Sequence, residues 1–165
     1  MFELKPLSKE GIPAALEKAE RYRLLNQPRL SESICLDILD ADPDNQDTIV
    51  LLILSITDQF RRGMYRKAKQ ARELIPRLNG EYEKLYYSGI ICERQAKAIF
   101  NQGQPGSKYD AYEWFCEAMG YYEKAEKMHP TGNDDAILRW NTCVRIIMDQ
   151  NLEERPADEF HPFLE

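Results

Sequence analysis

The chain has 165 residues, of which 43% are hydrophobic and 30% charged, the balance of an ordinary globular domain with a sizeable core. Its net charge of −6 and sequence pI of about 5.1 argue against nucleic acid or an anionic membrane as the main partner. The first residues lack the apolar core of a signal peptide. The longest apolar run, residues 49–56, is too short to span a bilayer, so we expect a cytoplasmic protein.

Two helices are predicted in the first part of the chain. Residues 1–11 form an irregular lead, and Pro13 suits the first turn of a helix because its missing N–H is not needed there. Residues 26–28 end this helix. A second helix follows and ends at the polar turn of residues 42–45, whose Asp, Pro and Asn favour turns and helix caps.

The next two predicted helices cover residues 47–60 and 64–78. The first of them is apolar on nearly every side, which indicates a helix sandwiched between neighbours. A buried strand is the alternative for residues 49–56, and we reject it because the flanking segments are helical hairpins. Pro76 interrupts the last turn of the fourth helix, and the Asn79-Gly80 pair indicates a turn.

Three longer helices complete the predicted core. The fifth covers residues 81–101 and the sixth residues 109–129, with a flexible loop of Gly and Pro between them. The seventh covers residues 133–150 and has a broad apolar face, with Asn133 or Asp134 as its cap.

One packing register occurs twice along the chain. The sixth helix has a small residue, an aromatic, a second small residue and a proline at Ala118, Tyr122, Ala125 and Pro130. The second predicted helix, which belongs to the first hairpin, has the equivalent positions at Ser31, Cys35, Ile38 and Pro43. Small residues on one helical face let a neighbouring helix come close, and the proline ends the run.

On these residues and the DPDN turn at residues 42–45, the chain resembles the tetratricopeptide repeat (TPR) family. It departs from the family pattern because no tryptophan precedes Ala19 and because Cys35 replaces the usual aromatic. The resemblance implies an all-α, right-handed stack of about three antiparallel hairpins, a TPR-like α-solenoid, with a C-terminal capping helix. This domain would cover residues 1–150, followed by an acidic tail of residues 151–165.

The third hairpin, residues 81–129, departs most from the usual repeat. Gly89 is the expected close-contact residue of the fifth helix, and it lies 29 residues before Ala118, whereas about twelve is usual in the family. We expect this hairpin to protrude by roughly two turns per helix. Whether it serves binding or oligomerisation stays open.

The resemblance also implies a concave wall lined by the first helix of each hairpin. The candidate peptide-binding residues on it are Glu17, Glu20, Arg23, Gln59, Tyr86, Tyr87, Arg94, Asn141 and Arg145. Aromatics beside arginine and amide groups are typical of peptide-binding surfaces. The family's chaperone-binding clamp is not expected, because Leu16 and Glu20 occupy its positions on the first helix.

No catalytic, cofactor-binding or metal-binding residue is predicted. The glycine-containing loop at residues 103–107 lacks the lysine and the preceding strand of a phosphate-binding loop. Neither His129 nor His161 has a cysteine at metal-ligand spacing. The four cysteines, which fall in apolar helical patterns, are expected to be buried and reduced: Cys35, Cys92, Cys116 and Cys143.

The leading functional hypothesis is a non-catalytic scaffold that binds a protein or peptide partner on the concave face. The first alternative is self-association into a homodimer through the fifth and sixth helices. Their surplus aromatics are interpreted as core or interface rather than as a ligand cage: Tyr109, Tyr112, Trp114, Phe115, Tyr121 and Tyr122. A small-molecule-binding helical bundle is the second alternative. Phe160 and Phe163 of the tail either dock in the groove or belong to a frayed end.

Overall fold

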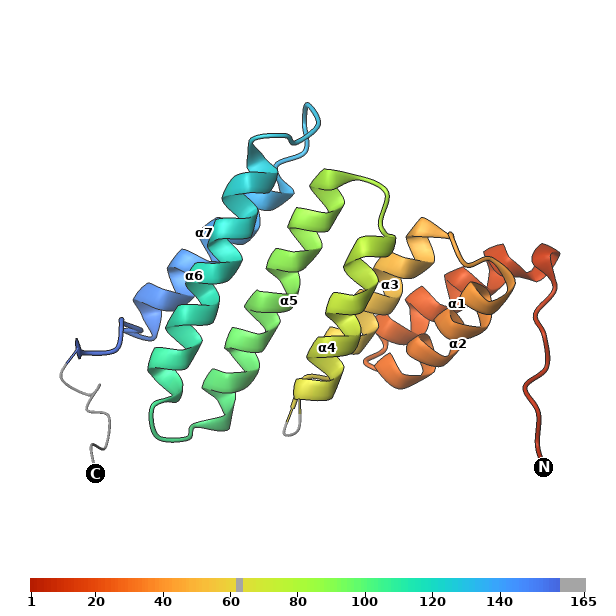
Figure 1. Ribbon diagram of the computed structural model, residues 1–165, viewed down its shortest axis with the longest axis horizontal. Coiled ribbons are helices and arrows are strands. Elements are labelled where there is room, and N and C mark those ends of the chain that lie inside the picture. The colour runs from red at the N-terminus through yellow and green to blue at the C-terminus, as the bar shows by residue number, and fades with distance from the viewer. Residues whose placement is uncertain (62–63, 158–165) are drawn as a thin grey trace, which may run out of the picture.

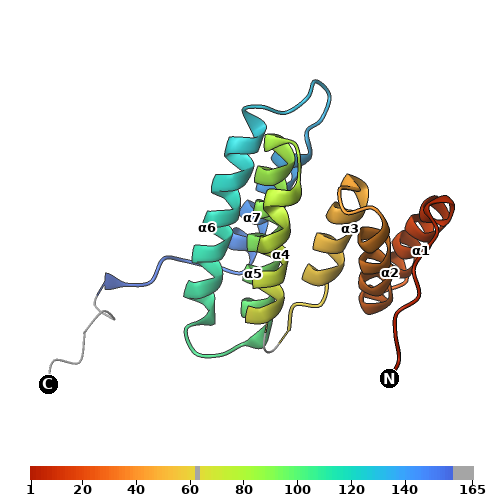
Figure 2. The same ribbon diagram turned by 45° about the vertical axis from the view of Figure 1, so that its right-hand side comes forward.

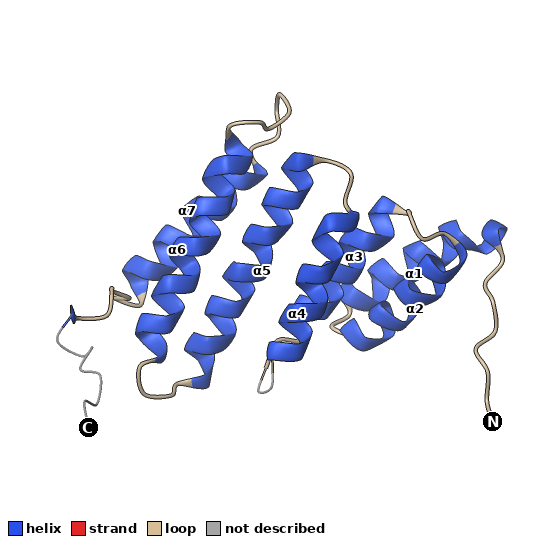
Figure 3. Cartoon of the chain, in the orientation of Figure 1, coloured by secondary structure: helices blue, strands red, loops and turns tan. Residues whose placement is uncertain are grey.

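The protein is all-α throughout the part of the chain that the computed structural model describes, residues 1–61 and 64–157 (Figure 3). The helices are α1 (Ile12–Leu24), α2 (Pro28–Ala41), α3 (Gln46–Thr57), α4 (Tyr65–Leu74), α5 (Glu81–Gln102), α6 (Ser107–Glu126) and α7 (Asp135–Asp149). Short 3₁₀ turns cover Lys9–Gly11 and Ile75–Arg77. Within the described ranges, no helix combines the length and the apolar character that crossing a membrane requires.

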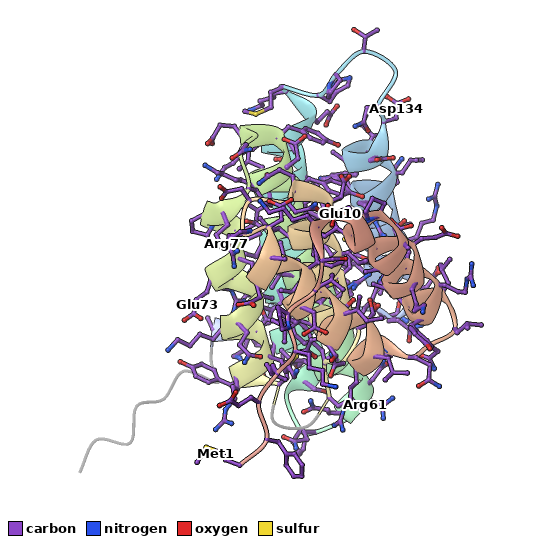
Figure 4. All side chains as sticks on the ribbon, turned by 90° about the vertical axis from the view of Figure 1, so that its right-hand side faces the viewer. Met1, Glu10, Arg61, Glu73, Arg77 and Asp134 are labelled. Atoms are coloured by element: carbon purple, nitrogen blue, oxygen red, sulfur yellow. The ribbon has the colours of Figure 1, made fainter. Side chains whose placement is uncertain are left out.

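Each helix packs against the next one along the chain, so the molecule extends from its N-terminal to its C-terminal side (Figures 1 and 2). In addition, α3 contacts both α1 and α5. Seen from the N-terminal end, α4 lies on the opposite side of the molecule from α7, with Glu73 marking the first and Asp134 the second (Figure 4). These contacts fit a helical repeat, and the predicted all-α class is confirmed.

The packing register read from the sequence forms the core. The positions predicted to pack are all completely buried: Ser31, Cys35, Ile38, Ala118, Tyr122 and Ala125. Ala19 of α1 is buried as well. The hydroxyl of Ser55 donates a hydrogen bond to that of Ser31 at 2.8 Å, so the small polar residue between α2 and α3 has a partner.

The polar turn before α3 caps this helix and also forms hydrogen bonds to the loop before α5. Asn45 is the N-cap residue, and its Oδ1 accepts from the Thr48 amide at 3.0 Å and from the Thr48 hydroxyl at 2.7 Å. The next residue, Gln46, donates to the carbonyl oxygen of Arg77 at 3.2 Å and accepts from the Asn79 amide at 2.9 Å. The start of α3 is thereby joined to the loop that leads into α5.

Several helices are shorter than the sequence pattern predicts. The third ends at Thr57 rather than Phe60, and the sixth ends at Glu126 rather than at residue 129. Pro130 explains the second difference, because its ring conflicts with the carbonyl four residues earlier, which belongs to Glu126. Pro76 interrupts the fourth helix as predicted, since a 3₁₀ turn replaces the last α-helical turn there.

The third hairpin has the longest helices. There are 22 residues in α5 and 20 in α6, against 10 to 14 in the four helices before them. At 1.5 Å of rise per residue, the longer pair exceeds the others by about 12 Å. Both helices extend past α3 and α4 in Figures 1 and 2.

The buried side chains divide into two clusters that share α5. One cluster gathers residues of α1 to α4 and includes Ile91 of α5. The other gathers residues of α5, α6 and α7 and includes Ile90, together with Leu152 just after α7. Because adjacent residues of α5 serve different clusters, this helix is the common wall of the core.

The described part of the tail is packed against the fold rather than frayed. Leu152 is buried, and the Arg155 guanidinium donates to Asp110 Oδ1 of α6 at 2.7 Å. The question of whether Phe160 and Phe163 dock in the groove concerns residues outside the described ranges.

The contact between α5 and α6 requires a residue without a side chain at position 89. A Cβ built on Gly89 would lie 2.5 Å from Cε1 of Tyr122, closer than real Cβ atoms approach any group. Tyr122 is completely buried and has no room to withdraw. The close approach predicted at Gly89 is therefore confirmed.

We expect Gly89→Ala to lower the free energy of unfolding by about 2 kcal/mol, because the added methyl group overpacks this contact. Gly120→Ala is the matched control. It lies inside α6 with nothing within 4 Å of its added Cβ, so it should raise stability by up to about 1 kcal/mol through helix propensity. Urea denaturation measures both, and equal effects of the two substitutions would contradict the close-contact assignment.

Candidate functional site

The candidate site is a hollow of about 640 Å³ between α1, α3 and α5, within the size range of ligand pockets. Its lining includes six apolar or aromatic residues, which we call the floor: Leu24, Val50, Leu51, Leu54, Leu78 and Tyr87. Polar side chains also line it, with carboxylates from Glu20, Asp47 and Glu83 and a guanidinium from Arg23. We call it the α1/α3/α5 hollow.

The floor exists because α3 is apolar on all sides. Val50 and Leu54 are one turn apart, so both face the hollow, while the other faces of the helix serve the core. Leu24 at the end of α1 is 82% exposed beside them. Tyr87 of α5 is half-buried, and burial raises the pKa of its hydroxyl to about 12, so this group is a neutral hydrogen-bonding group at physiological pH.

An ion bridge adjoins the hollow through two of its lining residues, Arg23 and Leu54. Asp58 accepts from Nε of Arg23 at 2.7 Å through one oxygen and pairs with Nη1 of Arg94 at 2.7 Å through the other. Nη1 of Arg94 also donates to the Leu54 carbonyl at 2.9 Å and to the Thr57 hydroxyl at 2.6 Å. Burial lowers the pKa of Arg94, against the opposing effect of Asp58. The bridge joins α1, α5 and the end of α3.

Four of the predicted groove residues gather here. Glu20, Arg23 and Tyr87 line the hollow, and Arg94 meets Arg23 through their shared carboxylate, Asp58. They come from α1 and α5, which the prediction assigned to the concave wall. Their role in binding stays a prediction.

The structure places the other candidates outside the hollow. Glu17 is exposed and pairs with Arg21 at 3.2 Å within α1. The Gln59 side chain donates to Glu32, so it faces α2 instead. Tyr86 packs on the second core cluster, with its ring stacked on that of Tyr82 at 5.8 Å. Asn141 and Arg145 belong to α7, which does not line the hollow.

Sequence reasoning did not find most of the floor and rim. Asp47, Val50 and Leu54 were assigned to a helix buried on all sides, and Glu83 was assigned to the start of a helix. The available signal was the low polarity of α3 itself, because a helix that is apolar all round leaves apolar side chains on any face that neighbours do not cover.

A buried carboxylate on α5 was also missed. Glu93 is only 1% exposed, and its Oε2 accepts from the Tyr122 hydroxyl at 2.6 Å. Its Oε1 pairs with Lys97 and with Nη1 of Arg139 of α7 at 3.3 Å. The sequence contained a signal for the burial of Glu93. It lies four residues after Gly89, so the two residues share one side of α5, which is buried.

The Glu93 network affects the charge of its partners. Burial raises the pKa of the Tyr122 hydroxyl, and the negative charge of Glu93 raises it further, so Tyr122 stays a donor. Burial alone would lower the pKa of Arg139, but Glu93 reverses this effect and the pKa lies above its usual value. Tyr122 is thus a neutral donor, Glu93 accepts its hydrogen bond, and Arg139 is the cation that pairs with Glu93.

A second hollow, of about 250 Å³, lies on the other side of the Asp58 bridge. Arg94, Lys97 and Arg139 line it together with Asp58. These basic groups are paired, Arg94 with Asp58 and both Lys97 and Arg139 with Glu93.

Three of the four cysteines are buried as expected, but the expectation for Cys116 is wrong, because its position on α6 faces outward. Burial raises the thiol pKa of Cys35 and Cys143 to about 12 and that of Cys92 to about 11. At a pH above 9.0, the ordinary pKa of a thiol, the three cysteines lose their protons in the unfolded chain but keep them in the folded chain. Their contribution to the free energy of unfolding therefore falls as the pH rises from 9.0 towards 12.

Comparison with protein-family models, curated proteins and solved structures finds no match for this chain. The resemblance to tetratricopeptide repeats rests on the packing residues described above. Among residues 1–61 and 64–157, no group of three or more His, Cys, Asp or Glu side chains is arranged to hold a metal ion.

We expect a thiol reagent such as DTNB to label Cys116 rapidly in the folded protein at about pH 8, because reaction needs an accessible thiolate. The buried thiols should react only at the rate of unfolding. Cys116→Ser is the matched control, and it should remove the fast phase completely. Rapid labelling of several thiols in the C116S protein would contradict the packing described for the other three.

Glu93→Gln should lower the free energy of unfolding by about 3 kcal/mol, because it removes the buried charge that Lys97 and Arg139 neutralise. Glu113→Gln makes the same chemical change at an exposed position of α6 and should stay within about 0.5 kcal/mol of the wild type. Urea denaturation measures the free energy of unfolding of both variants. If E93Q unfolds with the same free energy as the wild type, the network contributes nothing to stability.

Proposed function

We propose that the chain is a non-catalytic, TPR-like scaffold, a right-handed stack of helical hairpins that binds a protein or peptide segment. The observation that carries the proposal is the α1/α3/α5 hollow, an open apolar floor formed jointly by alternate helices. The first helices of successive hairpins line the binding face in helical-repeat proteins, and α1, α3 and α5 hold this position in the chain.

The chemistry of the hollow supports binding of a side chain. Its volume of about 640 Å³ suits one or two large apolar groups, and polar groups around the floor can fix the orientation of a backbone. Leu24 leaves most of its surface in water when the hollow is empty, so covering it with a ligand is favourable.

Peptide selection tests the proposal. Random dodecapeptides displayed on phage are selected on the wild-type protein, and the affinities of the enriched peptides are then measured by fluorescence anisotropy. Leu24→Arg should weaken binding by about tenfold or more, because it replaces an apolar contact with a charge. Since Leu24 is 82% exposed, the variant should fold normally, which far-UV circular dichroism checks.

Leu36→Arg is the matched control, because Leu36 is 55% exposed on α2 and does not line the hollow. This variant should bind the same peptides as tightly as the wild type. Selection that yields no peptide sensitive to L24R, or equal losses in L24R and L36R, would contradict binding in the hollow.

A further inference from the structure

Three carboxylates from three different helices surround the α1/α3/α5 hollow. Glu20 comes from α1, Asp47 from α3 and Glu83 from α5. In the described residues, none of the three forms an ion pair with a basic side chain. The one base among the described lining residues, Arg23, donates to Asp58 at 2.7 Å, so three carboxylates face a single guanidinium group. The hollow is therefore acidic as well as apolar.

Helix stability accounts for two of these carboxylates but not for the third. Asp47 and Glu83 lie in the first turns of α3 and α5, where an acidic group interacts favourably with the helix dipole. Glu83 also folds back over Gly80 at the start of its helix. Glu20, in contrast, lies in the second half of α1, away from the first turn, so the helix dipole does not account for it.

The floor restricts what can occupy this acidic site. A small cation such as a lone lysine ammonium would leave Leu24, Val50 and Leu54 uncovered, whereas an apolar side chain alone would leave the three carboxylates without a partner. A segment that carries both groups satisfies both parts of the surface. Lys and Arg also cover apolar surface with their methylene stems.

The neighbouring hollow offers a cationic segment less. Among its described lining residues, the one carboxylate, Asp58, is already shared by Arg23 and Arg94, and Lys97 and Arg139 pair with the buried Glu93. Complementarity therefore favours a cationic ligand over α1, α3 and the start of α5. Charge of this kind contributes more to partner choice than to affinity, since each exposed ion pair contributes little.

We propose that the α1/α3/α5 hollow recognises a peptide segment in which a large apolar side chain is flanked by Lys or Arg. The apolar side chain covers Leu24, Val50 and Leu54, and the flanking cations pair with Glu20, Asp47 and Glu83. This inference rests on the proposed function, because it names the chemistry of the segment that the scaffold binds.

The peptides selected on the wild-type protein provide the test. Those that depend on Leu24 should carry Lys or Arg next to Leu, Ile, Phe, Met or Trp. Their binding should weaken about threefold in Glu20→Gln and about tenfold in Glu20→Lys, and it should weaken further as salt is added. Glu20 is the residue to change because it does not stabilise the start of a helix.

Glu17→Gln and Glu17→Lys are the matched controls, since Glu17 lies one turn earlier on the same helix and does not line the hollow. They should leave binding unchanged. Peptides that depend on Leu24 but lack Lys and Arg, or bind E20K as well as wild type, overturn the inference while the proposed function stands. A selection that yields no peptide dependent on Leu24 overturns both.

Discussion

The fold depends on the close approach of α5 and α6 at Gly89. Because this position has no Cβ, the Tyr122 ring fits against the backbone of α5 and is completely buried. A buried hydroxyl needs a partner, which Glu93 supplies at 2.6 Å, and the buried carboxylate in turn needs cations from Lys97 and Arg139. One missing side chain thus leads, step by step, to the docking of α7.

This junction also determines where the candidate site lies. With Gly89 and Glu93 facing α6 and α7, the remaining faces of α5 turn Tyr87 and Arg94 towards α3 and α1. Tyr87 lines the α1/α3/α5 hollow, and Arg94 pairs with Asp58, which also binds Arg23 of the hollow. The packing of the long hairpin and the geometry of the hollow are therefore two consequences of the same rotation of α5.

The sequence predicted what depends on side-chain size and missed what depends on helix rotation. Spacing of small residues and aromatics identified the buried face of α6 and the close contact at Gly89, because only small residues permit such an approach. Gln59 was assigned to the concave side, yet it bonds to Glu32 of α2. Neighbouring helices determine which side of a segment is covered, and the local sequence around Gln59, just after α3, does not indicate it.

The two core clusters share α5, with Leu54 of α3 also packed against the second cluster, and each helix touches mainly its neighbours in the chain. Cohesion in such an array is a sum of local interfaces, and an end helix has fewer of them than a central one. We therefore expect α1 and α7 to open more readily than α5, whose amide protons should exchange last. The binding face proposed above then has one wall in the least stable part of the array and another in its most stable part.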